Sequence, residues 1–205
     1  MTISVPPYTP DSIDFGLVHN VQVSTSQLSG LSQTLELPGA RWKASLHYSN
    51  LSGSEARIMK AWLISLKGMA NRFYLHDFSQ PNPTAAPGTI SAVLPGSTAR
   101  VLNITTTGAD FSIGDYLQVG AELKMIVAIP SADHYTIEPA MRDQTPVGLA
   151  VVATQATGIF MLSSNDQSYW SAAGKASLSD ISFECVEIFW SPKVSQDLTF
   201  SWNEE

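Results

Sequence analysis

The 205-residue chain has a single cysteine and few charged side chains. Cys185 has no second cysteine to pair with, which excludes an internal disulfide, and its apolar neighbours predict a buried thiol. Charged residues make up 14% of the chain, the formal net charge is −7 and the pI is near 5.0. A chain this acidic has no general basic surface for phosphates, so sequence-specific nucleic-acid binding is not expected.

Metal-binding and catalytic histidine motifs are also missing. The four histidines, His19, His47, His76 and His134, lack metal-ligand spacing, and surface positions are expected for all four. The His76-Asp77 pair is half of a general-base arrangement, but no Gly-x-Ser-x-Gly or His-Glu-x-x-His motif accompanies it. We therefore expect no catalytic residues, and a protein that is not an enzyme.

Loops that bind cations or phosphates are incomplete. The turn at Gly114-Asp115 lacks the further oxygen ligands of a calcium loop, and a tight turn capped by the aspartate explains it. The Pro38-Gly39 turn lacks the lysine and second glycine of a phosphate loop. The expectation is no metal and no cofactor.

Long apolar runs are absent as well. No stretch of about 18 consecutive apolar residues occurs, and residues 1–10 contain no basic segment followed by an apolar one. Neither membrane insertion nor a recognisable export signal is expected.

What the sequence does contain is mostly strand pattern. Residues 41–48 alternate, with Trp42, Ala44, Leu46 and Tyr48 on one face, which predicts a half-buried strand. Upstream, residues 15–23 and 33–37 are predicted strands. They are separated by a loop rich in Ser, Thr and Gly, residues 24–32, which we expect to become ordered only on assembly. Together they predict a long hairpin with a polar tip.

One helix is predicted after the central strand. Ser52 and Glu55 form a capping-box pattern, and Gly68 provides a C-terminal stop. Between them the apolar residues recur at helical spacing, which predicts an amphipathic helix lying on a sheet. The expected apolar stripe is Ile58, Met59, Trp62, Leu63 and Leu66. A strand at residues 73–75 is expected to follow the helix.

A proline-rich linker separates two styles of strand. Residues 80–87 carry three prolines, which neither a central strand nor a helix accommodates. Five short strands follow within some sixty residues, at 89–94, 100–105, 116–119, 122–129 and 134–138. In the fourth, Leu123, Met125, Val127 and Ile129 alternate with the residues between them. This pattern predicts a small β-barrel.

Longer strands return after this region, at 159–162 and 178–190, the second with apolar residues on both faces. The simplest organisation is a discontinuous core domain, residues 1–80 plus 155–205, with a small β-barrel domain inserted at residues 81–154. We call residues 81–154 the inserted segment.

Two further features suggest contacts with other molecules. Trp42 and Trp62 lie on apolar faces and are expected in the core, whereas Trp170 beside Tyr169 in a polar region suggests an exposed contact, either with a ligand or with another subunit. In the C-terminal tail, Leu198, Phe200 and Trp202 alternate with polar residues, which predicts an amphipathic strand. That strand either closes its own sheet or adds to the edge of a neighbouring subunit.

Several of these segments together resemble the distal tail proteins of long-tailed, siphovirus-like bacteriophages. The similarity runs in order from about Val21 to Ile188, and residues 191–205 depart from it. The matching segments are the run Gln33-Thr34-Leu35-Glu36-Leu37-Pro38-Gly39-Ala40-Arg41-Trp42, the helix with Trp62-Leu63 and Gly68, Asn71-Arg72-Phe73-Tyr74-Leu75, Gly114-Asp115-Tyr116-Leu117-Gln118-Val119-Gly120, Thr136-Ile137-Glu138-Pro139-Ala140-Met141-Arg142 and Phe183-Glu184-Cys185-Val186-Glu187-Ile188.

The resemblance implies a mainly β fold: a tail-tube-like β-sandwich flanked by one α-helix, here with an inserted small β-barrel. It implies a structural virion protein at the distal end of the tail. Six copies would form a homohexameric ring that joins the tail-tube protein to the hub or baseplate protein. DNA would pass through the lumen of this ring. The alternative is that the inserted segment makes the chain a host-surface glycan-binding module of the tail tip.

Overall fold

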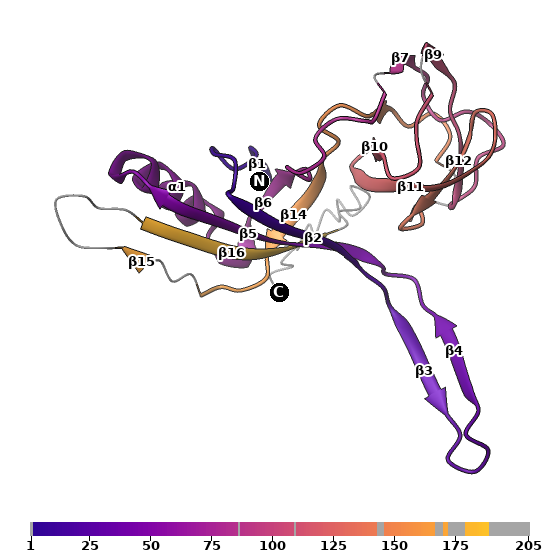
Figure 1. The fold of residues 1–205 in the computed structure, drawn as a ribbon, viewed down its shortest axis with the longest axis horizontal. Coiled ribbons are helices and arrows are strands. Elements are labelled where there is room, and N and C mark those ends of the chain that lie inside the picture. Colours follow the sequence, from indigo (N-terminus) through magenta and orange to yellow (C-terminus); the bar gives the residue numbers. More distant parts are fainter. Residues whose placement is uncertain are drawn as a thin grey trace, which may run out of the picture.

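The computed structural model describes residues 2–85, 87–108, 110–142, 146–166, 170–171 and 179–188. The described part of the chain is mainly β, with 46% of its residues in strands and 10% in helices. Its strands form two larger sheets, each beside its own cluster of buried apolar residues, and two small two-stranded sheets (Figure 1).

The larger sheet has seven strands in the order β1-β6-β14-β16-β5-β2, with β15 beside β16. The short β1–β6 pair is parallel, and the other pairs are antiparallel. The strands are β1 (Thr2–Ile3), β2 (Ser12–Val18), β5 (Arg41–Leu51), β6 (Arg72–Leu75), β14 (Gly158–Leu162), β15 (Trp170–Ser171) and β16 (Ser179–Glu187).

The long central strand β5 confirms the expected alternation. Trp42, Ala44, Leu46 and Tyr48 are all buried, and the residues between them are exposed or half-buried. Helix α1 (Gly53–Leu66) covers the same face of the sheet (Figure 1). The period-2 pattern thus places one side of β5 in the core and leaves the other side facing outward.

Helix α1 begins at the predicted capping box, with both reciprocal bonds between Ser52 and Glu55 present. It ends at Lys67, which takes a left-handed conformation with φ 52°, and the short helix η1 (Gly68–Ala70) follows. The expected stripe is wrong at Ile58, which is 51% exposed. The buried face is turned away from Ile58, and it consists of Ala56, Met59, Trp62, Leu63 and Leu66.

The opposite face of the sheet is open on β16. Ile181, Phe183 and Cys185 are buried against the helix side, as expected. On the other face Ser182 and Glu184 are exposed, but Val186 and Ile188, the residues expected to be covered on that face, are half-buried. Phe189 and Trp190 lie outside the described residues.

The second sheet has five strands in the order β13-β10-β11-β12-β8. Among the described strands its two ends, β13 and β8, are not paired with each other, so this is an open sheet. A separate pair, β7–β9, accompanies it. The bounds are β7 (Pro87–Ile90), β8 (Val101–Asn103), β9 (Thr106–Gly108), β10 (Tyr116–Val119), β11 (Glu122–Ser131), β12 (His134–Glu138) and β13 (Val151–Val152).

Strand β11 does not keep the simple alternation that its sequence suggests. Leu123 and Lys124 are both buried, whereas Val127 and Ile129 are 41% and 38% exposed. The beginning of β11 lies between the two cores, since Leu123 belongs to one cluster and Ile126 to the other. The pairing with β12 then shifts register beyond Ile126, and the end of the strand leaves both cores.

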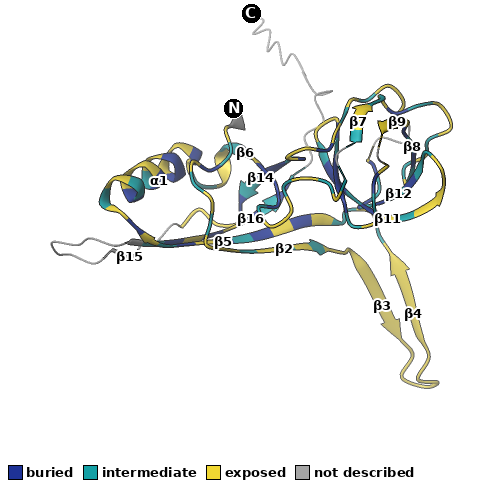
Figure 2. Ribbon diagram, turned by 45° about the horizontal axis from the view of Figure 1, so that its top comes forward, coloured by how far each residue is buried: buried dark blue, intermediate teal, exposed yellow. Residues whose placement is uncertain are grey.

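The hairpin of β3 (Val21–Thr25) and β4 (Ser32–Glu36) forms a sheet of its own and projects from the body of the molecule (Figures 1 and 2). The strand expected at residues 15–23 is divided, because β2 ends at Val18 and β3 starts at Val21. The side chain of Asn20 donates to the Pro38 carbonyl oxygen at 3.0 Å, at the point where the hairpin leaves the large sheet.

No helix among the described residues has the length and hydropathy needed to cross a lipid bilayer.

Candidate assembly surface and its supports

The projecting hairpin carries no charge along most of its length. From Asn20 to Leu35 the sequence contains no Asp, Glu, Lys or Arg. All ten residues of β3 and β4 are exposed (Figure 2). Exposed strands of soluble proteins are usually protected by charged side chains, so an uncharged hairpin lacks that protection.

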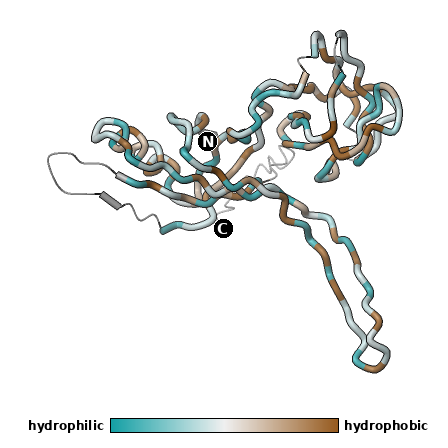
Figure 3. The backbone as a smooth tube through the Cα atoms, in the orientation of Figure 1, coloured by the Kyte–Doolittle hydropathy of each residue, from teal (hydrophilic) through white to brown (hydrophobic). Residues whose placement is uncertain are grey.

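The register of the hairpin places apolar side chains on both of its faces. Val21 and Val23 lie on one face, opposite Glu36 and Thr34, and Leu35 lies on the other face, opposite Gln22. Val23 is 60% exposed and Leu35 is 56% exposed. Figure 3 shows these apolar positions interspersed with polar ones along both strands.

The tip of the hairpin is a compact turn. The Ser26 N–H donates to the Leu31 carbonyl at 2.9 Å, and the Gly30 N–H donates to the Ser26 carbonyl at 2.9 Å. Gly30 takes a positive φ of 70°, which this turn requires. Leu28 at the tip is fully exposed. The loop expected at residues 24–32 is therefore shorter, because β3 and β4 extend to Thr25 and Ser32.

A two-stranded hairpin with nothing packed on it is marginally stable in water. This hairpin exposes apolar side chains on both faces, and before Glu36 it has no charged side chain to keep other molecules away. These properties are typical of a surface that another protein covers. We call the hairpin from Val21 to Glu36 the candidate assembly surface.

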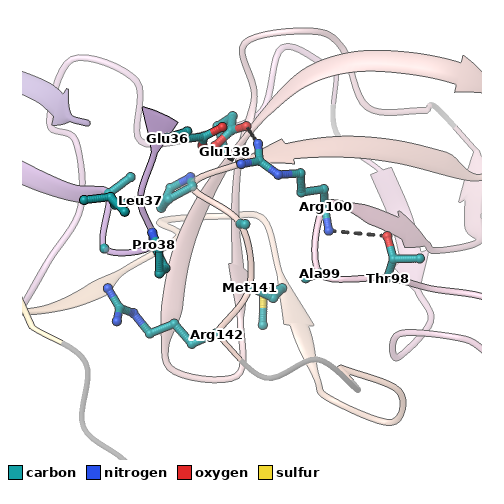
Figure 4. A pocket seen from close by; sticks show the side chains of 13 residues that line it. Glu36, Leu37, Pro38, Thr98, Ala99, Arg100, Glu138, Met141 and Arg142 are labelled. Carbon is teal, nitrogen blue, oxygen red and sulfur yellow. Dashed lines mark hydrogen bonds and ion pairs between the residues drawn. The ribbon is translucent and has the colours of Figure 1, made fainter. Parts of the chain in front are cut away.

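The base of the hairpin is attached to the inserted segment by an ion-pair bridge. The guanidinium of Arg100 donates to the carboxylates of Glu36, at the end of β4, and of Glu138, at the end of β12 (Figure 4). The hydrogen bond to Glu36, followed by the charge of Glu138, raises the pKa of Arg100. Beside this bridge lies an open groove of about 610 Å³, bordered by the hairpin base and the inserted segment.

A second, buried attachment lies between the large sheet and the inserted segment. Glu187 at the end of β16 is 1% exposed. One of its carboxylate oxygens accepts from the Trp42 N–H at 3.3 Å and the other from the Leu123 N–H at 3.1 Å. The Trp42 indole N–H also donates to the Leu123 carbonyl at 2.9 Å. We call Trp42, Leu123 and Glu187 the junction.

Charged side chains of the inserted segment lie close to the junction. Lys124 is fully buried, and its Nζ is 2.6 Å from a carboxylate oxygen of Glu122 and 3.2 Å from the Ala140 carbonyl oxygen. The same Glu122 oxygen accepts from the Arg142 N–H at 3.4 Å. A buried cation next to Glu187 offsets part of the cost of burying that carboxylate.

Burial nevertheless has the largest effect on the pKa of Glu187. Removal of the Glu187 carboxyl from water raises its pKa to about 7, against the opposing effects of Lys124 and of the two backbone N–H donors. Glu187 is therefore a titratable group with a pKa near neutrality, although its side chain is nearly inaccessible to solvent.

The histidines expected at the surface do not all lie there. His19 and His47 are exposed, but His76 is buried and 8% exposed. Both His76 and Asp77 follow the end of β6, where the sheet no longer alternates, so both can turn inward. Within the described part of the chain, His76 Nδ1 has no hydrogen-bond partner, and burial lowers the pKa of this imidazole.

The turn at Gly114-Asp115 holds the inserted segment together. The Asp115 carboxylate accepts from the Ser112 N–H and the Thr84 N–H, each at 2.8 Å, and from the Thr84 hydroxyl. Gly114 has a φ of 96°. The turn predicted from the sequence is thus present. Across the described residues no group of three or more His, Cys, Asp or Glu could hold a metal ion.

The core tryptophans are where the sequence predicts them. Trp42 and Trp62 are 3% and 9% exposed. Trp170 lies in the short strand β15, but its side chain and Tyr169 fall outside what the structure describes, as do residues 195–205. Cys185 is fully buried, and burial raises the pKa of its thiol.

The roles of Arg100 in the ion-pair bridge and of Glu187 in the junction were not predicted from the sequence. Arg100 gives no local signal, because its partners are 64 and 38 residues away along the chain. Glu187 does give one, since it continues the alternating positions of Ile181, Phe183 and Cys185, which are all buried. An acidic residue in that phase predicts a carboxylate that needs internal partners.

No family model matches the chain, and no curated protein matches it.

Proposed function

We propose that this chain is a structural subunit of a bacteriophage tail tip and not an enzyme. In this proposal it forms the ring that connects the tail tube to the hub or baseplate and continues the DNA channel. The main support is the candidate assembly surface, an exposed hairpin without charge between Asn20 and Leu35. An exposed hairpin without protecting charges favours pairing with another protein.

The finer architecture belongs to the same proposal. The large sheet with α1 would be one layer of a tail-tube-like β-sandwich, and its open face at Glu184 would be covered in the assembly. Residues 81–154 would be an inserted domain of the small-barrel kind. The two clusters of buried residues support this division, although Tyr116 and Leu123 of the inserted segment pack into the larger cluster.

Closed rings form when two different patches of one subunit meet head to tail. The hairpin supplies one patch, and the outer edge of the large sheet at β2 is a candidate for another. The proposed partners are therefore other copies of this chain, six in the complete ring, together with the tail-tube and hub proteins. The proposed location is the distal end of the virion tail.

The glycan-binding alternative has weaker support in the geometry. A sugar site in the groove beside the inserted segment would need polar groups that are available to a ligand. The charged groups Arg100, Glu36 and Glu138 on this groove are already paired with one another.

The proposal is tested by native mass measurement and electron microscopy of the purified chain. We expect rings for the wild type, and single subunits for a Val23→Lys, Leu35→Lys double variant. The matched control is Ile113→Lys, which adds a lysine at another exposed apolar position, 65% exposed, in the inserted segment. The control should still form rings.

Two results would contradict the proposal. One is a wild-type chain that stays monomeric both alone and with purified tail tubes. The other is intact phage particles in which antibodies against this chain label a structure other than the tail tip.

A further inference from the structure

The inserted segment leaves and rejoins the large sheet at a single place. Its two connections run side by side there, since the Gln155 N–H donates to the Pro81 carbonyl at 2.6 Å. Two adjacent connections can act as a hinge, because they do not by themselves fix the direction of what they carry. Contacts away from the hinge must therefore decide how the inserted segment is oriented.

The junction is one such contact. It joins β16 and β5 of the large sheet to β11 of the inserted segment through both carboxylate oxygens of Glu187. Ring contacts reinforce it, with the centroids of Trp42 and Tyr116 5.5 Å apart. Gly158 shows how closely the junction is packed, since a Cβ built there would lie 3.1 Å from Glu187 Oε1 and from Leu123 Cβ.

The second contact away from the hinge connects the inserted segment to the hairpin. Arg100 directly precedes β8, and it reaches across the groove to Glu36 at the end of β4 (Figure 4). Glu138 of β12 accepts from the same guanidinium, which holds the arginine in position. The inserted segment is therefore attached at one end to the sheet and at the other to the base of the hairpin.

We propose that the inserted segment sets the direction in which the hairpin is presented: Glu187 fixes the segment on the sheet, and Arg100 transmits its position to the hairpin base. Glu187 and Arg100 are positioning residues in this arrangement. The inference rests on the proposed function in treating the hairpin as the assembly surface. A molecule that binds and tilts the inserted segment would thereby change how the hairpin meets its partner.

The test is amide hydrogen exchange of the hairpin in the full-length chain at low concentration. Arg100→Gln should accelerate exchange at the base of the hairpin by about two- to fivefold, the range that corresponds to one exposed ion pair. Glu36→Gln should have the same effect, and the double variant should show no further increase.

A matched control removes an ion pair that touches neither the hairpin nor the inserted segment. Lys43 and Glu184 form such a pair on the open face of the sheet at 2.8 Å, with exposure close to that of Arg100 and Glu36. Lys43→Gln should leave exchange in the hairpin unchanged. An Arg100→Gln effect no larger than that of Lys43→Gln would overturn the proposal.

The Glu187 half of the arrangement is tested separately. Glu187→Gln keeps the shape of the side chain but turns an amide N–H₂ group toward one of the two backbone donors, so one bond is lost. We expect faster exchange at the Leu123 amide and also at the hairpin base around Glu36. Faster exchange at Leu123 without any change in the hairpin would overturn the proposal that Glu187 influences the hairpin through the inserted segment.

If the Glu187 variant does not fold, the cycle of Arg100 and Glu36 variants still decides the outcome. All these measurements use the isolated chain and need no ring. Their failure would leave the ring proposal standing, and a monomeric wild type would contradict the ring proposal without affecting them.

Discussion

The hairpin and the junction differ in how their polar backbone groups find hydrogen-bond partners and in how far their side chains are buried. In the hairpin, the backbone groups pair across two strands and the side chains remain exposed and uncharged. In the junction, Glu187 and the Trp42 indole supply partners for backbone groups that are buried between two sheets. The junction is complete within one chain, whereas the hairpin leaves its apolar side chains without cover.

This difference separates stability from assembly. Buried groups with internal partners contribute to the folding of the single subunit, and their loss is costly because the partner is left unsatisfied. Exposed apolar groups contribute little to folding, and they are buried only when a second protein covers them. Substitutions in the two regions should therefore have separable effects on unfolding and on ring formation.

The largest expected effect is that of Trp42→Ala in the junction. The substitution removes a buried aromatic ring that contacts Phe15 and Tyr116, and it leaves the Leu123 carbonyl without the indole donor. We expect a loss of about 3–5 kcal/mol in the free energy of unfolding, measured with denaturant. The milder Trp42→Phe should lose less, since it keeps an aromatic ring and removes the hydrogen bond. Equal losses would show that the hydrogen bond contributes most of the effect.

The next effect is a pH dependence that originates at Glu187. Its pKa is raised to about 7 in the folded chain, above the ordinary value of 4.5, so its contribution to stability is fully present below about pH 4.5 and is lost as pH rises through 7. The charged groups facing it are Lys124, Glu122 and Arg142, and Lys124 limits the shift. The full difference is about 3 kcal/mol.

The Glu187→Gln variant isolates this contribution, because other carboxyl groups are common to both proteins. Between pH 5 and pH 8 the wild type should lose unfolding free energy relative to the variant, as followed by denaturant unfolding at each pH. A difference that stays constant over this range would contradict the raised pKa.

A smaller effect is expected from crowding the junction at Gly158. An added Cβ would lie 3.1 Å from Glu187 Oε1, from Leu123 Cβ and from Phe160 Cε2. Gly158→Ala should cost about 1–3 kcal/mol, the range for overpacking a well-filled core. Gly16→Ala in β2 of the same sheet is the control, since nothing lies within 4 Å of a Cβ there. A similar change in both variants would mean that the junction has room to relax.

The two regions also differ in how much of them the sequence predicts. The hairpin could be anticipated because its strands and the turn between them are close together in the chain, although the division at His19 and Asn20 was not. The helix was predicted from its capping box, while the exposure of Ile58 was not, since the direction of a helical stripe depends on how the helix packs on the sheet.

The phase of Glu187 in its strand indicates a buried carboxylate, but its partners could not be anticipated, because the parts of the junction come from positions 42, 123 and 187 of the chain. Strand pattern alone cannot say that β11 is covered on both faces at Leu123 and Lys124, as this depends on how the two sheets meet. The exposure of Val127 and Ile129, further along β11, also depends on how the two sheets meet. Long-range contacts thus determine whether each of these residues is buried, and local periodicity does not encode such contacts.

The smallest expected effect on stability is that of a substitution in the hairpin, and it tests directly whether the hairpin is separate from the folded core. Val23→Thr replaces an exposed apolar side chain by a polar one of similar shape and strand preference. The unfolding free energy of the single subunit should change by less than about 0.5 kcal/mol, while ring formation should weaken measurably. Val93→Thr, at a buried valine that is 1% exposed, is the matched change and should destabilise the subunit by about 1–3 kcal/mol. If Val23→Thr instead destabilised the isolated chain as much as Val93→Thr, the hairpin would be part of the folded core in solution, and its exposed side chains would no longer argue for a partner.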